Sequence, residues 1–170
     1  MLTDYIKKPS RYLIYGGREF FRSFNINFME EVDQQFIEKK LDNVLKYREE
    51  LEPLFKFSDE EIKKDNLKLR TVERLIQLIA DEMVDINSYL IKKLNFPVPD
   101  DFQSTFYVLA NNNILVKDFA NKIAPIIGLR NRLVHRYEKV DMDLLLKMAR
   151  EGKSDFKIYA KQSSDFLSKN

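Results

Sequence analysis

His135 is the one histidine of this 170-residue chain, and it lies in the basic segment "RNRLVHRY" of residues 130–137. The imidazole of histidine changes charge near neutral pH, so His135 is a candidate general base or acid. Arg130 keeps its charge, and its planar guanidinium is suited to binding a carboxylate or a phosphate. The segment therefore predicts proton transfer beside a bound anion. Since a lone histidine on a helix is more often a capping or hydrogen-bonding residue, a purely structural role stays open.

Arg130 falls within an apolar stripe of the helix that carries this segment. At about 100° per residue, one side of that helix gathers Phe119, Ile123, Ile126, Ile127, Leu133, Val134 and Tyr137. A guanidinium in such a stripe is costly unless a carboxylate or a bound anion meets it. Asp81 and Asp85 are its candidate partners, because they follow one another along a polar stripe of an earlier helix. The alternative is that this polar stripe is only a solvated face.

The neighbouring face of the same helix is small or polar, and consists of Ala120, Asn121, Ala124, Gly128, Asn131 and His135. This composition predicts a shallow polar groove that another molecule can approach closely. Asn131 lies one turn before His135 and is expected to hydrogen-bond in the same direction. Arg132 and Arg136 flank the groove on its solvent side, so the sequence predicts a local positive patch around one titratable base.

Two long amphipathic helices precede this segment. The clearest is predicted at 59–94, where apolar residues recur at steps of three and four and a capping box of Ser58 and Glu61 marks the start. Another helix is predicted at 29–52 and is ended by Pro53. The short connection between the two makes them antiparallel neighbours.

The whole pattern predicts an all-α domain at residues 29–170, folded as an up-and-down bundle of four to five helices. Its other helices are expected in "DDFQSTFYVLANNN", at 115–136 with a kink or split at Pro125, and after the N-cap Asp141. Residues 1–28 do not share this pattern. The run "RYLIYGGREFF" in them favours an appended β-hairpin, and a loosely attached extension is the alternative.

Composition excludes several classes of function. The chain has no cysteine, which rules out disulfides, cysteine nucleophiles and iron–sulfur clusters, and we predict no metal site and no cofactor. A net charge of +2 does not indicate a general polyanion binder. No apolar run approaches the roughly 18 residues that cross a bilayer, so we expect a soluble, cytoplasmic protein without membrane contact.

The segment "GLRNRLVHRYEKVD" resembles the signature of the HEPN superfamily, and in particular that of HepT-like toxins. That signature is an arginine, four residues beginning with a polar one, a histidine, any residue and a tyrosine. Arg130, Asn131, His135 and Tyr137 match it position by position. The likeness extends over roughly residues 29–168 through the two long antiparallel helices, whereas Pro125 is not a feature of the family.

The resemblance implies a homodimer with facing motif helices, acting as a metal-independent endoribonuclease toxin of a type VII-like toxin–antitoxin system. It also implies an MntA-like minimal nucleotidyltransferase antitoxin, which silences the toxin by adding AMP to Tyr137. The implied catalytic residues are Arg130, Asn131 and His135, and Arg132 and Arg136 become candidates for binding RNA. Metal-free RNA cleavage needs a base for the 2′-hydroxyl proton and a fixed cation for charge on phosphorus, which His135 and Arg130 would supply.

One geometric difficulty accompanies this assignment. Five residues of regular helix place the side chains of Arg130 and His135 about 140° apart. Either the long Arg130 side chain extends around the helix towards His135, or the helix distorts near Gly128. Alternatively, a two-fold dimer brings Arg130 of one chain beside His135 of the other. We favour the dimer, because a face with Ala124, Gly128 and Asn131 permits close approach.

Three other classes of function compete with the nuclease. The first is a non-catalytic HEPN-like module that binds a nucleotide, RNA or a partner nucleotidyltransferase. The second, a carboxylate-bridged metal bundle, needs more histidines than this chain has. The third, a helix-turn-helix DNA reader, fits poorly with the low net charge and with the apolar residues around Arg130.

Overall fold

The computed structural model describes residues 33–135 and 141–169, and helices are the regular secondary structure within them. In chain order they are α2 Gln34–Leu51, the 3-10 turn η1 Leu54–Lys56, α3 Asp59–Lys64, α4 Asn66–Lys93, α5 Ser104–Asn111, α6 Lys117–Ile123, α7 Ile126–His135 and α8 Met142–Lys169. This confirms the all-α prediction. The predicted hairpin and the domain boundary after residue 28 lie outside the described residues.

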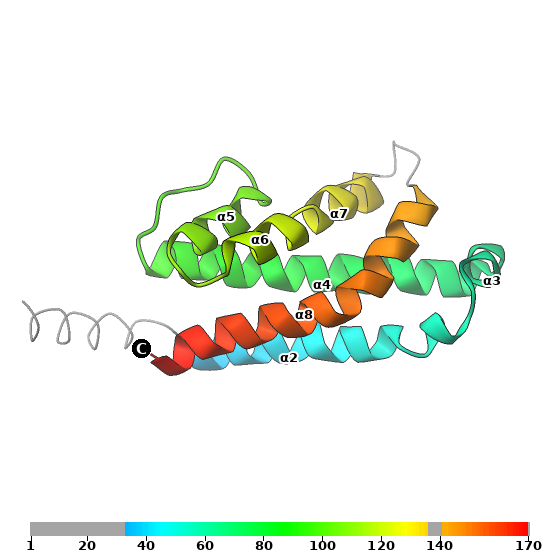
Figure 1. The fold of residues 1–170 in the computed structure, drawn as a ribbon, viewed down its shortest axis with the longest axis horizontal. Helices are drawn as coiled ribbons and strands as arrows, with labels where there is room; N and C mark the ends of the chain where they lie inside the picture. The colour runs from blue at the N-terminus through cyan, green and yellow to red at the C-terminus, as the bar shows by residue number, and fades with distance from the viewer. Residues whose placement is uncertain (1–32, 136–140, 170) are drawn as a thin grey trace, which may run out of the picture.

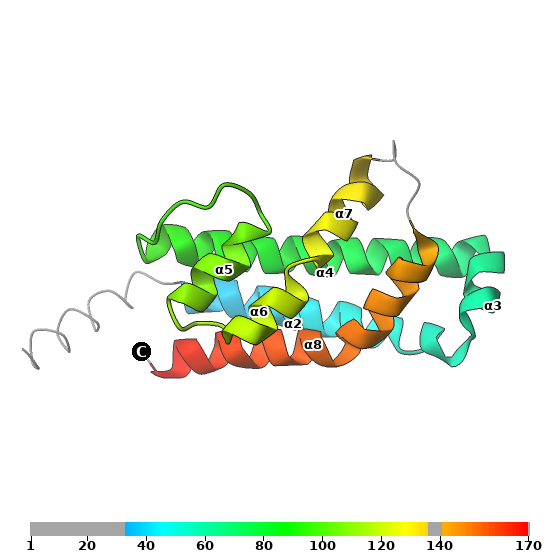
Figure 2. The same ribbon diagram turned by 45° about the horizontal axis from the view of Figure 1, so that its top comes forward.

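Three long helices form the body of the bundle (Figure 1). Helix α4 runs antiparallel to α2, and α8 returns along α2, with contacts among all three. The shorter helices α5, α6 and α7 follow one another along α4 (Figure 2), and α5 and α7 both contact it. The order of directions confirms an up-and-down bundle. Among the described helices, none is long and apolar enough to span a membrane.

The predicted capping box starts α3, but the helix expected at 59–94 is broken. Glu61 accepts a hydrogen bond from the Ser58 N–H at 2.8 Å, and the Glu61 N–H donates to Ser58 Oγ at 3.3 Å. The break falls at Asp65, whose backbone is extended and whose carboxylate accepts hydrogen bonds from the N–H groups of Leu67 and Lys68. A short acidic side chain that bonds to nearby backbone offers an alternative to continuing the helix, so Asp65 caps α4 instead.

Aspartate side chains also cap the N-termini of α2 and α8. Helix α2 begins at Gln34 rather than near residue 29, because the carboxylate of Asp33 caps it by accepting from the Phe36 N–H at 3.0 Å. Asp141 caps α8, as predicted, and accepts from the N–H groups of Asp143 and Leu144 at 3.0 Å each.

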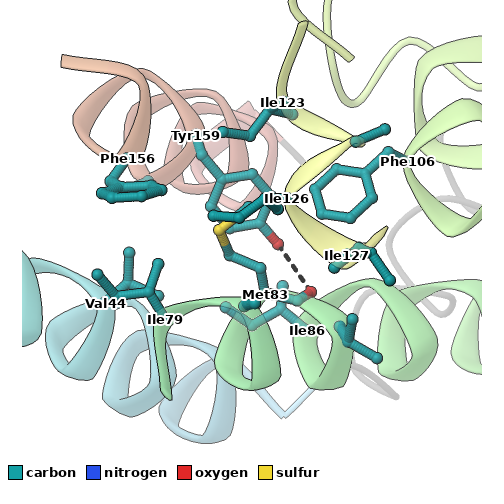
Figure 3. Close-up of a cluster of buried hydrophobic side chains, with 14 of the residues drawn as sticks. Val44, Ile79, Met83, Ile86, Phe106, Ile123, Ile126, Ile127, Phe156 and Tyr159 are labelled. Atoms are coloured by element: carbon teal, nitrogen blue, oxygen red, sulfur yellow. Dashed lines mark hydrogen bonds between the residues drawn. The ribbon is translucent and has the colours of Figure 1, made fainter. Parts of the chain in front are cut away.

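Pro125 splits the predicted helix at 115–136 into α6 and α7. Proline has no N–H to donate and its ring clashes with the preceding turn, so one continuous helix cannot pass through this position. The first residues of α7, Ile126 and Ile127, then turn into the core above α4. Figure 3 shows them beside Tyr159 of α8 and Met83 of α4, so the N-terminal half of the motif helix is held by packing.

Candidate functional site

Arg130 is joined to the long helix α4 by an ion pair. Its Nε donates to Asp81 Oδ1 at 2.6 Å, and both side chains remain partly exposed, at 25% and 35%. The two line a cavity of about 300 Å³ together with Phe102 and Ile127. The core residues of α7 thus bring Arg130 to the edge of the bundle, and a carboxylate of α4 fixes the direction of its guanidinium.

This pairing leaves most of the guanidinium available. Arginine carries five N–H donors, and Asp81 is met by the one on Nε. Nη1 of Arg130 lies 3.4 Å from Oδ1 of the exposed Asn131. A phosphate or carboxylate can therefore bind at the Nη edge without breaking the pair with Asp81.

Asp85, the other carboxylate expected as a partner of Arg130, bonds to α2. Its Oδ2 accepts from Lys40 Nζ at 2.7 Å, and Glu82 Oε2 accepts from the same nitrogen at 2.7 Å. Burial of Lys40 opposes its charged form, but its hydrogen bonds to Asp85 and Glu82 outweigh this and raise its pKa. Asp85 lies in the wall of the Arg130 cavity, yet its hydrogen bond ties α4 to α2.

His135 is the last residue of α7. Its imidazole, and also Arg136 and Tyr137, lie outside the described residues, so their expected roles stay predictions. Arg132 is described and is half-buried, one residue beyond the exposed Asn131. The structure therefore brings Arg130, Asn131 and Asp81 together and places the backbone of His135 at the end of the same helix.

Comparison with known proteins shows which family this chain belongs to. A family model described as Ribonuclease HepT-like matches residues 44–163, which include all the residues of this site. The chain belongs to the HepT-like family.

Individual relatives agree with this assignment. The HepT-like chain is 28% identical over 139 residues to the tRNA nuclease HepT of Aphanizomenon flos-aquae, a match that covers 82% of this chain and 95% of that protein. It is 24% identical over 81 residues to the mRNA nuclease HepT of Shewanella oneidensis, over 48% of this chain and 61% of the relative. Its fold is similar to that of a tri-AMPylated Shewanella oneidensis HEPN toxin in complex with MNT antitoxin, with a TM-score of 0.70, 18% identity and coverage of 76% and 97%.

The polar groove predicted beside the HepT-like motif is smaller than expected. Ala120 and Ala124 are fully buried in the core, so they do not form an open face. The prediction assumes one helical wheel through residues 115–136, and the split at Pro125 gives α6 and α7 different orientations. On α7 the open positions are Asn131, which is exposed, and Gly128, where an added Cβ would meet nothing within 4 Å.

The apolar stripe on the HepT-like motif helix is also shorter than predicted. Ile126 and Ile127 are buried, and so is Leu129, which the predicted stripe did not include. Leu133, however, is half-buried, and Val134 is 37% exposed. Figure 2 shows the reason, because the C-terminal end of α7 rises away from α4. Residues 131–134 therefore lie where the helix leaves the bundle, and Asn131 and Val134 are accessible to another molecule.

A larger groove on the HepT-like chain, of about 800 Å³, lies between the end of α4, the loop at 95–103 and α5. Sequence reasoning missed it, since "FPVPDDF" indicates only a connection between helices. The groove adjoins the Arg130 cavity, because the side chain of Phe102 lines both. Its signal in the sequence is the pair of aromatic residues, Phe96 and Phe102, in a short loop with two prolines and two aspartates.

Proposed function

We propose that this chain is a metal-independent endoribonuclease and the toxin of a type VII-like toxin–antitoxin system. The observation that carries the proposal is the placement of Arg130 in a HepT-like chain. The arginine lies at the edge of the bundle, oriented by Asp81, five residues before the one histidine of the chain. A base near neutral pKa and a fixed cation are the two groups that metal-free cleavage of RNA requires.

In the proposed reaction His135 removes the proton of a ribose 2′-hydroxyl. The 2′-oxygen forms a bond to the adjacent phosphorus while the bond from phosphorus to the 5′-oxygen breaks. The departing 5′-oxygen takes up a proton from water, and His135 returns its proton to the solvent. The Nη edge of Arg130 stabilises charge on the phosphorane, and Asn131 orients the phosphate or the imidazole. The products end in a 2′,3′-cyclic phosphate and a 5′-hydroxyl.

The surface of α7 supports a proposal for how the chain binds its substrate and assembles. Arg132 and Arg136 are proposed to bind flanking phosphates of single-stranded RNA. The open face at Gly128 and the exposed Val134 favour a homodimer in which two motif helices approach each other, which would bring Arg130 of one chain near His135 of the other. Sedimentation at micromolar concentration is expected to show a dimer, and a monomer that still cleaves RNA would contradict this arrangement.

Control of the nuclease is proposed to act through Tyr137. An MntA-like nucleotidyltransferase would transfer AMP from ATP to the tyrosine oxygen and release pyrophosphate. The added phosphate would bring negative charge and bulk to the motif and so exclude RNA. The similar Shewanella oneidensis toxin is itself tri-AMPylated and bound to an MNT antitoxin. Tyr137→Phe is expected to keep nuclease activity and to escape silencing, whereas silencing of that variant through added AMP would contradict the assignment.

The proposed reaction is tested by the position of the attacking oxygen. An RNA whose cleavage site has been mapped is synthesised again with one 2′-deoxyribose on the 5′ side of that site. Cleavage there is expected to disappear, while cleavage at other sites persists and yields cyclic phosphate ends. Equal cleavage of the deoxy strand would exclude 2′-hydroxyl attack. Absence of cleavage of any RNA would favour a non-catalytic binding module.

A further inference from the structure

We propose that the groove beside Arg130 is a nucleobase subsite, in which the ring of Phe102 stacks on the base next to the phosphate held by Arg130. This inference rests on the proposed function, since it concerns how the same site binds RNA. The loop at 95–103, which lies outside the motif segment at 130–137, would then take part in recognising the substrate.

The Arg130 cavity and the groove adjoin each other at one residue. Phe102 lines the Arg130 cavity of about 300 Å³ and also the groove of about 800 Å³. Asn131 lies in the wall of the groove, and its Oδ1 is 3.4 Å from Nη1 of Arg130. A nucleotide whose phosphate meets Arg130 can therefore extend its base into the groove, which is large enough for a nucleoside.

The walls of the groove combine an aromatic ring with hydrogen-bonding groups, which suits a base, and one lysine, Lys92, lies among them. Phe102 is 53% exposed and Val98 of the same groove is 90% exposed, so the groove presents an open apolar surface that includes an aromatic ring. Asp100 and Asp101 also line the groove and would repel a phosphate, but their carboxylates can accept hydrogen bonds from the amino group of a base. Asn95 and Asn131 add both donors and acceptors. Arg130, oriented by Asp81, marks the phosphate position, and the aromatic ring of Phe102 marks the base position.

A chain of hydrogen bonds anchors the backbone of Phe102. The hydroxyl of Thr105 donates to the Phe102 carbonyl at 2.6 Å and accepts from Asn87 Nδ2 at 3.0 Å. Oδ1 of Asn87 in turn accepts from the buried Tyr159 hydroxyl at 2.8 Å. The loop that carries the Phe102 ring is thus anchored through α4 to α8, so its backbone loses little freedom when the ring binds a base.

The chain has no tryptophan, so Phe102→Trp introduces a single indole fluorophore at the proposed contact. The probe is a short oligoadenylate with 2′-O-methyl riboses, which cannot be cleaved through the 2′-oxygen. Saturable quenching of the indole fluorescence is expected in this variant, because the base stacks on the ring. The control is Leu67→Trp, since Leu67 is 78% exposed at the other end of α4. Absence of quenching in Phe102→Trp, or equal quenching in both variants, would overturn the proposal.

Cleavage kinetics provide a second, independent test. Phe102→Ala is expected to raise KM for RNA about tenfold with a smaller change in kcat, because one stacking contact is lost. Phe102→Tyr is expected to restore KM, whereas Phe102→Leu, which keeps the bulk but not the ring, is not. Equal KM values for the Leu and Tyr variants would overturn the stacking contact, and so would dissociation of a dimer by Phe102→Ala, which would place the ring in a protein interface. Quenching without any cleavage would support the subsite and count against the nuclease itself.

Discussion

Arg130 Nε lies 2.6 Å from Asp81 Oδ1, so the motif arginine of α7 takes its direction from a carboxylate of α4. The Nη groups then point to where a phosphate can bind, and the pair removes part of the freedom of a long side chain. Asp81→Ala is expected to lower kcat for RNA cleavage about tenfold or more, because the guanidinium is no longer held in a productive orientation. Asp81→Asn should retain more activity, since its amide oxygen can still accept from Nε.

The matched control for Asp81 is Asp85→Ala, which removes a carboxylate from the same cavity without touching Arg130. Asp85 bonds to Lys40 of α2 and is 57% exposed, so its loss should leave cleavage within a few-fold of wild type. Equal losses in the two alanine variants would mean that local negative charge, and not the pairing with Arg130, supports the site.

The shape of the Arg130 side chain is expected to matter as much as its charge. Arg130→Lys keeps a cation but loses the planar fork that matches both a carboxylate and a phosphate. Single-turnover cleavage should fall about 100-fold or more, with the circular dichroism spectrum unchanged. Cleavage within a few-fold of wild type would remove Arg130 from contact with the reacting phosphate.

Two glycines of the bundle should respond in opposite ways to alanine. At Gly152 in α8 an added Cβ would lie 2.6 Å from Cζ and 2.9 Å from Cε2 of Phe156, a ring that is fully buried and cannot turn away. Gly152→Ala should therefore lower the free energy of unfolding by about 1–3 kcal/mol. Gly128→Ala meets no atom of its own chain within 4 Å and should raise the free energy of unfolding of the monomer by up to about 1 kcal/mol through helix propensity. Urea unfolding measures both changes in the free energy of unfolding. A change of the same sign in the two variants would contradict the packing described at Gly152.

Stability should depend on pH through the capping box of α3. The backbone hydrogen bond from Ser58 lowers the pKa of Glu61, so the folded state favours the ionised carboxyl. The stability that ionised Glu61 gives to the folded state is fully present above the ordinary pKa of a glutamate, about pH 4. It is lost as the pH falls through the lowered pKa of Glu61 in the folded protein. Glu61→Gln keeps an acceptor oxygen but does not titrate. The difference in Tm between wild type and Glu61→Gln should therefore shrink from pH 7 to pH 3, and a constant difference would contradict the assignment.

Much of the fold could be predicted from local signals. The cap residues Ser58 and Asp141 and the helix-breaking Pro125 act through backbone geometry within a few residues, so their effect is readable in the sequence. Asn95 and Asn113, which follow α4 and α5, adopt positive φ angles of 51° and 59° that asparagine tolerates.

Features that depend on tertiary packing could not be predicted. A single helical wheel across Pro125 puts Ala120 and Ala124 on an open face, whereas the split turns both into the core. The groove at Phe102 forms only where a loop, two helices and Asn131 meet. By contrast, Asp81 could be named beforehand as a candidate partner of Arg130, because an arginine among apolar residues requires a counter-charge and few carboxylates share the right stripe.

The most direct test of the nuclease is cleavage of an unstructured RNA in excess EDTA by wild type and by His135→Ala. The intact mass of each protein is recorded first, so that AMP on Tyr137 is detected before activity is compared. We predict that unmodified wild type cuts and leaves 2′,3′-cyclic phosphate ends, while His135→Ala is inactive. Equal cleavage by the two proteins, or no cleavage by wild type free of AMP, would contradict His135 as the base of a metal-independent ribonuclease.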